Sequence, residues 1–258
     1  LWVMVIVAMP ILGTLLYFFL GNKSTGKRLK KKLERATAML PKPLDEGNTE
    51  DILQDDLRLG QTLAHISQVT GFPVVQNGTS KYYSFGEEMF RDMCRDLQAA
   101  QDHIYVEYFI IQSGKFWDTL ADIMAQKVTE GVDVRIMYDD LGSIGTFSVV
   151  DVIELSQKGI KCIPFNPFLF IKSQLNNRDH RKLMVIDGQI AYSGGVNLAD
   201  EYINKKRRFG HWKDTAIMIK GPAVRSFTLM FLQNWDAAAK RATDPTPYLK
   251  NNYIREPG

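Results

Sequence analysis

Hydrophobic positions follow three successive patterns along the chain. Residues 1–20 are apolar and carry no charged side chain, about the length that crosses a bilayer. Residues 21–47 are basic at first and then rich in proline and acidic residues. From residue 48 onward, apolar runs alternate with amphipathic stretches. We predict a transmembrane helix over 1–20, a basic juxtamembrane segment and linker over 21–47, and a folded domain over 48–258.

The apolar segment is followed, rather than preceded, by basic residues. These are Lys23, Lys27, Arg28, Lys30, Lys31, Lys32 and Arg35, against the single acid Glu34. A signal peptide would carry its basic residues before the apolar run. The other alternative to a transmembrane helix over 1–20 is a buried core helix. The positive-inside tendency favours an anchor with the folded domain in the cytoplasm. The bases either set topology alone or also attract anionic lipid headgroups.

The pattern after residue 48 is typical of an α/β domain whose helices cover a mostly buried sheet. Residues 71–84 are rich in turn formers, and Asp187-Gly188 between two apolar runs predicts a hairpin. We expect helices near 51–69, 87–100, 116–130, 146–158 and 223–240, and strands near 103–111, 132–138, 160–165, 183–186, 190–192 and 215–219.

The net charge and the cysteine positions argue against several classes of protein. The formal net charge is +3, too small to indicate a nucleic-acid-binding protein. Cys94 and Cys162 lie far apart without metal-ligand spacing, so neither a disulfide framework nor a zinc site is expected.

The densest polar cluster precedes the predicted hairpin and contains His180 and Lys182. Side chains two residues apart on a strand share a face, so this imidazole and this ammonium would enter one pocket. An imidazole nitrogen can attack phosphorus while a lysine neutralises the phosphate oxygens, without a metal ion or other cofactor.

Two further segments extend this expected site. Gly194 and Gly195 would let backbone amides approach an anion, and Asn197 would donate from its side chain. Asp214 could accept a hydrogen bond from His180 and so fix its tautomer.

These residues carry a family resemblance. His180, Lys182 and Asp187 match the HxKxxxxD signature of the phospholipase D superfamily, and residues 194–197 (GGVN) match its G-[SG]-x-N element. Residues 180–188, 210–215 and 221–224, together with the apolar N-terminus, resemble bacterial cardiolipin synthases more than the nucleases or phospholipases of the superfamily.

The resemblance implies a phospholipase D-like fold and transfer of a phosphatidyl group between two phosphatidylglycerol molecules. His180 is implied as nucleophile or general acid, and Lys182 and Asn197 as phosphate ligands. Asp187 is the motif acid, and at the start of a hairpin turn its carboxylate fits a structural role as well as a catalytic one. The expected partners are phosphatidylglycerol, other anionic phospholipids and the bacterial plasma membrane, and not nucleic acid. The family uses two HxKxxxxD motifs in one active site, and one is present here. We therefore expect the other half of the active site to come from a longer chain or from a second copy.

Two residues and two alternative functions stay open. Glu107 in an apolar stretch fits either a structural ion pair or the catalytic pocket, and His211 is a weaker pocket candidate. The alternatives are a phospholipase or single-motif homodimeric nuclease with the same chemistry, and a membrane module that binds anionic lipid without turnover.

Overall fold

One mixed sheet organises the folded part of the chain. The computed structural model describes residues 2–18, 26–39, 56–75, 78–167, 178–208 and 210–248. The seven strands run in the order β1-β7-β6-β5-β2-β3-β4. They are β1 (Thr79–Tyr83), β2 (His103–Tyr108), β3 (Asp133–Asp139), β4 (Lys161–Phe165), β5 (Lys182–Ile186), β6 (Ile190–Gly194) and β7 (Ala216–Lys220). The pairs β2/β3 and β3/β4 are parallel, and the other pairs are antiparallel.

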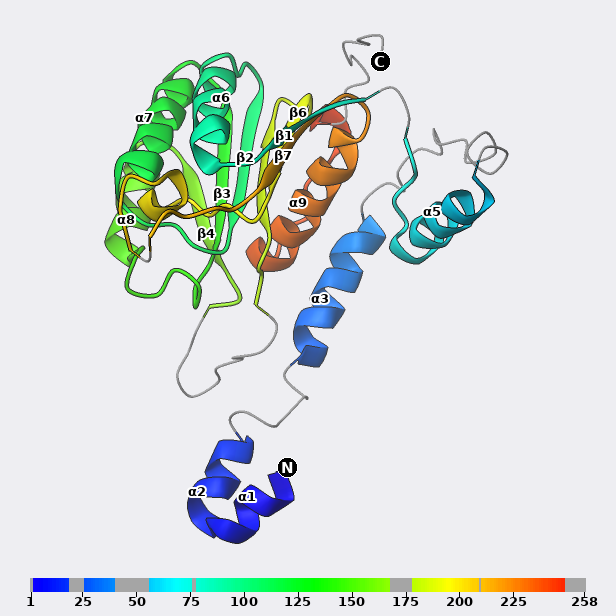
Figure 1. Cartoon of the computed structure of the whole chain (residues 1–258), viewed down its shortest axis with the longest axis vertical. Helices are drawn as coiled ribbons and strands as arrows, with labels where there is room; N and C mark the ends of the chain where they lie inside the picture. The colour runs from blue at the N-terminus through cyan, green and yellow to red at the C-terminus, as the bar shows by residue number, and fades with distance from the viewer. Residues whose placement is uncertain are drawn as a thin grey trace.

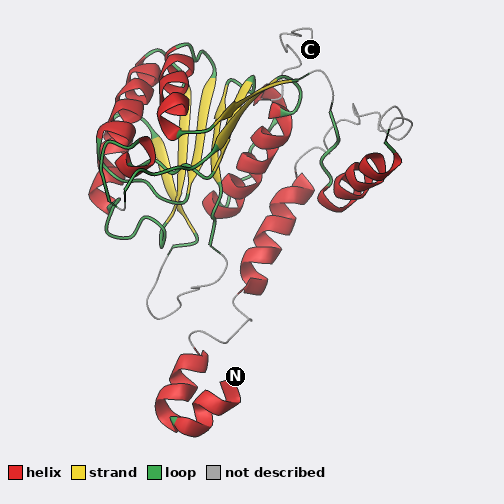
Figure 2. Cartoon of the chain, in the orientation of Figure 1, coloured by secondary structure: helices red, strands yellow, loops and turns green. Residues whose placement is uncertain are grey.

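Helices cover both faces of this sheet (Figures 1 and 2). One face carries α6 (Gly86–Gln98), α7 (Lys115–Thr129) and α8 (Val149–Gln157), and the other carries α9 (Val224–Ala239), on which α3 (Gly26–Met39) packs. The remaining helices are α1 (Trp2–Ala8), α2 (Pro10–Leu16), α5 (Leu57–Thr70), η4 (Asp200–Ile203) and η5 (Thr246–Tyr248). The predicted α/β sheet with helices on both faces is confirmed.

Strand β2 lies in the middle of the sheet and contributes to both layers of the core. Its six residues are all buried. Ile104 and Val106 face the helices α6 and α7, whereas Tyr105 stacks on Phe231 of α9 at 4.5 Å between ring centroids. Alternate burial on two faces explains why this segment is apolar at nearly every position.

The hairpin predicted at Asp187-Gly188 is present between β5 and β6. Both residues adopt positive φ, 53° and 63°, and the Gln189 N–H donates to the Ile186 carbonyl at 2.9 Å. These are the backbone angles that a two-residue hairpin turn requires.

Strand β1 was not predicted, because residues 71–84 were expected to form turns. It is an edge strand paired with β7, and only Tyr83 of its five residues is buried. A strand with one buried residue lacks the apolar run by which the other strands were found.

Residues 2–18 form α1 and α2, which are separated at Met9. Among the residues described, no helix has both the length and the apolar character needed to span a membrane. The transmembrane helix over 1–20 stays a prediction. Residues 40–55, which include the end of the predicted linker and the start of the folded domain, lie outside the described residues.

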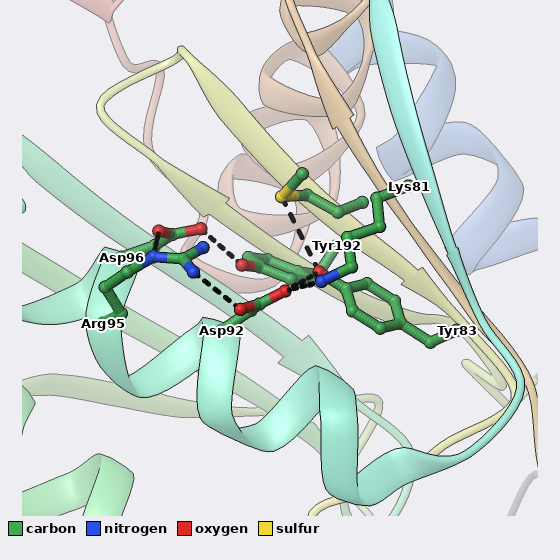
Figure 3. Close-up of polar contacts among 7 residues, drawn as sticks. Lys81, Tyr83, Asp92, Arg95, Asp96 and Tyr192 are labelled. Carbon is green, nitrogen blue, oxygen red and sulfur yellow. Dashed lines mark hydrogen bonds and ion pairs between the residues drawn. The ribbon is translucent and has the colours of Figure 1, made fainter.

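A polar network with buried tyrosines and carboxylates attaches α6 and the edge strand β1 to the sheet (Figure 3). The Asp92 carboxylate accepts hydrogen bonds from Lys81 Nζ at 2.6 Å and from the Tyr83 hydroxyl at 2.7 Å. Asp96 accepts from the Tyr192 hydroxyl, and Arg95 bridges the two carboxylates. Burial and the Asp96 carboxylate hold the pKa of Tyr192 above its ordinary value, so its hydroxyl remains a donor.

We expect Tyr192→Phe to lower the free energy of unfolding by about 1–2 kcal/mol, because a buried Asp96 oxygen loses its hydrogen-bond donor. Urea unfolding in detergent measures this loss. Tyr82→Phe is the matched control, because Tyr82 is 63% exposed and its hydroxyl removal should change little. Equal effects of the two substitutions would contradict a stabilising role of the network.

Candidate active site

His180 and Lys182 come together beside one aromatic ring at the end of the central strands. Lys182 begins β5 opposite Tyr108, the last residue of β2, and Phe109 follows directly. The His180 and Phe109 ring centroids are 4.6 Å apart, and Lys182 Nζ lies 5.2 Å from the Phe109 ring centroid. Sequence reasoning missed Phe109; an aromatic residue directly after the strand that pairs with the motif strand was the available signal.

The two motif side chains differ in exposure. His180 is exposed, whereas Lys182 is 4% exposed and donates from Nζ to the His180 carbonyl at 2.7 Å. Burial lowers the pKa of Lys182, and the Asp214 and Asp179 carboxylates partly oppose this shift. The site therefore offers a desolvated cation next to an accessible imidazole.

Gly194 and Gly195 are required by close packing against the neighbouring chain segment. A Cβ on Gly195 would lie 2.0 Å from Asp214 Oδ1, and one on Gly194 would lie 2.5 Å from the Thr215 carbonyl oxygen. The Gly195 N–H, expected to face an anion, donates instead to that carbonyl at 2.9 Å. The expectation for this amide is corrected: its hydrogen is already used within the chain.

We expect Gly195→Ala to displace the Asp214 carboxylate, because the added Cβ would lie 2.0 Å from Asp214 Oδ1, too close for two atoms that are not bonded. Losing this carboxylate near Lys182 should lower the lysine pKa further. NMR titration of the Lys182 side chain measures the shift. Gly131→Ala is the control, since the added carbon meets no atom within 4 Å; Gly131, unlike Gly195, has positive φ, so this variant adds backbone strain without displacing a neighbour. An unchanged Lys182 pKa in Gly195→Ala would contradict the expected displacement.

Asn197 is 3% exposed and both ends of its amide are engaged. Its Oδ1 accepts from the Ile110 N–H at 3.1 Å, and its Nδ2 donates to the Tyr202 hydroxyl at 2.7 Å. One hydrogen of Nδ2 remains for another acceptor. Asn197 thus anchors the segment after Phe109, and its role as a phosphate ligand stays a prediction.

Asp187 does not lie with His180 and Lys182. It follows the far end of β5, about 17 Å from Lys182 at ~3.3 Å per residue. Its carboxylate accepts hydrogen bonds from the backbone N–H groups of 101–103 at 2.7–2.9 Å. Of the two roles open for Asp187, these contacts favour the structural one: the carboxylate fixes the start of β2 against the hairpin.

Glu107 lies on the sheet face opposite Lys182, beneath α9. It is 1% exposed, accepts from Asn234 Nδ2 at 2.6 Å, and lies 3.3 Å from the Arg181 guanidinium. Burial and the neighbouring Asp179 carboxyl raise the pKa of Glu107 well above its ordinary value. Of the two alternatives for Glu107, the structure favours the structural one.

His211 and Asp214 lie on the segment that leads into β7. The exposed His211 ring contacts Phe85, with centroids 5.5 Å apart, and Lys213 Nζ lies 5.8 Å from the same ring. Among the described residues, His180 and Asp214 share no hydrogen bond; Lys182 and Tyr202 are electrostatic neighbours of Asp214. Orientation of His180 by Asp214 stays a prediction.

A family model described as "Cardiolipin synthase, PLD-like domain" matches residues 93–235, more than half of the chain. The chain belongs to this family. The match includes the strands β2 to β7 and therefore every element that carries the site, so the recognised phospholipase D resemblance is confirmed.

Individual relatives of this cardiolipin synthase-type domain agree with the family match. The chain is 40% identical to an uncharacterized protein of Streptococcus mutans, over 98% of this chain and 55% of that protein. It is 37% identical to a cardiolipin synthase of Geobacillus thermodenitrificans, over 91% of this chain and 47% of that enzyme. The chain thus spans about half the length of these relatives.

Among solved structures, this domain is similar to a phospholipase D family member, Nuc, from Salmonella typhimurium. The match has a TM-score of 0.49 and 17% identity, and it covers 62% of this chain and 95% of Nuc.

Proposed function

We propose that this chain supplies one half of the active site of a phospholipase D-type phosphatidyltransferase that makes cardiolipin from phosphatidylglycerol at the bacterial plasma membrane. The observation that carries the proposal is the pairing of an exposed imidazole with a buried ammonium beside Phe109. A buried cation interacts strongly with a developing phosphate charge because little water screens it.

In the proposed first step, a His180 ring nitrogen attacks the phosphorus of one phosphatidylglycerol. A P–N bond forms, the P–O bond to the headgroup glycerol breaks, and a general acid protonates the departing alkoxide. In the second step, a hydroxyl of another phosphatidylglycerol attacks this phosphohistidine. The P–N bond breaks, the hydroxyl proton passes to the group that served as acid, and cardiolipin and glycerol are the products.

The general acid in this scheme is a second histidine from a second half-site, either farther along the same polypeptide or in another copy. The family resemblance supports this arrangement, because one motif is present and the chain spans about half of its relatives. Lys182 and the free Nδ2 hydrogen of Asn197 would hold the phosphate oxygens.

The test is mass spectrometry of lipids after the chain is reconstituted into phosphatidylglycerol liposomes, alone and together with the second half of a full-length relative. Cardiolipin and an equal amount of glycerol are expected once both halves are present. Phosphatidic acid without cardiolipin would favour the hydrolase, and absence of any product would favour the lipid-binding module.

We expect the transfer rate to decline on the alkaline side at a lower pH than it would if Lys182 had the pKa of an ordinary lysine. The proposed role needs a protonated Lys182, and burial lowers its pKa. Asp214→Asn should move this decline to still lower pH, because it removes a carboxylate that favours the ammonium. The rate of cardiolipin formation is measured at roughly unit intervals from about pH 6 to about pH 11, a range that includes the ordinary lysine value of ~10.4.

Asp122→Asn is the control for this pH profile, since this α7 carboxylate is 78% exposed and has Lys158 as its ion-pair partner. A decline that does not move in Asp214→Asn would show that Asp214 does not influence the group that titrates.

A further inference from the structure

A basic groove runs between helices α3 and α9, away from the motif residues. Its cavity of about 640 Å³ is lined by Lys31, Lys32 and Arg35 of α3, the end of β4, and the last turn of α9 with Lys240. A second cavity of about 390 Å³ shares Lys32, Arg35 and Lys240 and adds Arg241. These volumes suit a small-molecule ligand.

The charges in this groove are not neutralised by the described part of the chain. Among the described residues, none of the three α3 cations makes an ion pair, whereas the adjacent Lys30 pairs with Glu34. The carboxylate in the groove, Asp236, accepts two hydrogen bonds from Thr243. The groove therefore presents a concentration of positive charge suited to an anion.

The floor of the groove is apolar. It consists of side chains from β4 and α9, including Ile163, Phe165 and Ala238. Free phosphate or a phosphorylated peptide would gain little from such a floor, whereas an acyl chain would be removed from water. Cations at the rim and an apolar floor together match an anionic lipid.

The chain just before α3 also indicates a lipid surface. Val7 of α1 and Ile11 of α2 are 75% and 81% exposed. Such exposed apolar side chains suit the interface of a bilayer. The groove thus follows closely in sequence on a segment whose exposed side chains are apolar.

We infer that this groove binds one anionic diacylglycerophospholipid at a site separate from the catalytic one. The inference does not rest on the proposed function, because the groove lies on the α9 face of the sheet. Lys182 points to the opposite face, the one that Tyr108 and Met184 share with α6 and α7.

The test is a titration of the full chain in detergent with dihexanoyl phosphatidylglycerol below its micelle concentration, followed by native mass spectrometry. The groove variant replaces Lys31, Lys32 and Arg35 by glutamine. The matched control replaces Lys30, Lys115 and Lys158 by glutamine, which removes the same charge from exposed positions outside the groove.

We expect the native chain to have a saturable lipid site that is weakened about tenfold or more in the groove variant and little changed in the control, since each base contributes about 1 kcal/mol. The Lys182→Met variant keeps the groove, so the same titration should still detect this site. Equal weakening in groove variant and control would reduce the effect to general charge attraction and overturn the inference. Glycerol 3-phosphate binding as tightly as the lipid would overturn the choice of a lipid, and loss of the site in Lys182→Met would assign it to the catalytic pocket.

Discussion

We expect His180→Ala to reduce phosphatidyl transfer at least about 10⁴-fold in the assembled two-half enzyme, the scale of loss when a nucleophile is removed. Among the described residues, the exposed imidazole neighbours the Phe109 ring and the Lys182 ammonium, and neither can replace its nitrogen as nucleophile. Cardiolipin formation in phosphatidylglycerol liposomes measures the loss.

His211→Ala is the matched control for His180→Ala. Its imidazole is also exposed and also packs on a phenylalanine ring, that of Phe85. Transfer should fall far less in this variant. Substantial transfer in His180→Ala would exclude His180 as nucleophile, and an equal loss in both variants would show that an exposed imidazole as such is not the decisive feature.

Local sequence was sufficient where one segment alone determines the structure. The Asp187-Gly188 turn was predicted because few residue pairs accept two positive φ angles in succession. Strand β2 was predicted because burial on both faces leaves a continuous apolar run. In contrast, β1 was missed because an edge strand with one buried residue has no such run.

The site was harder to predict where it depends on contacts between distant segments. The side on which Glu107 projects follows from its register with Leu183, and a shift of one residue would reverse it. Similarly, the Gly195 N–H looked available for an anion until its pairing with Thr215 was seen. Phe109 became part of the site only through the antiparallel pairing of β2 with β5.

The second large effect is a loss of stability when the Glu107 side chain beneath α9 is removed. Glu107→Ala should lower the free energy of unfolding by about 3 kcal/mol, because Asn234 loses its buried acceptor and a cavity opens. Glu107→Gln should cost much less. Burial and Asp179 raise the pKa of Glu107, which favours its neutral form, and glutamine is a neutral side chain of the same shape that keeps an acceptor oxygen for Asn234.

The pH dependence of this difference follows from the direction of the Glu107 shift. Because its pKa is raised in the folded state, the folded chain binds more protons than the unfolded chain above about pH 4.3, the ordinary glutamate value. The stabilisation from Glu107 is therefore complete at lower pH and declines as the pH rises toward the folded pKa. Urea unfolding at about pH 5 and pH 8 should show Glu107→Gln gaining stability relative to the native chain as the pH rises. A difference that stays constant, or a glutamine variant as unstable as the alanine variant, would mean that Glu107 is ionised in the fold and that the Arg181 contact has a larger role than the Asn234 hydrogen bond.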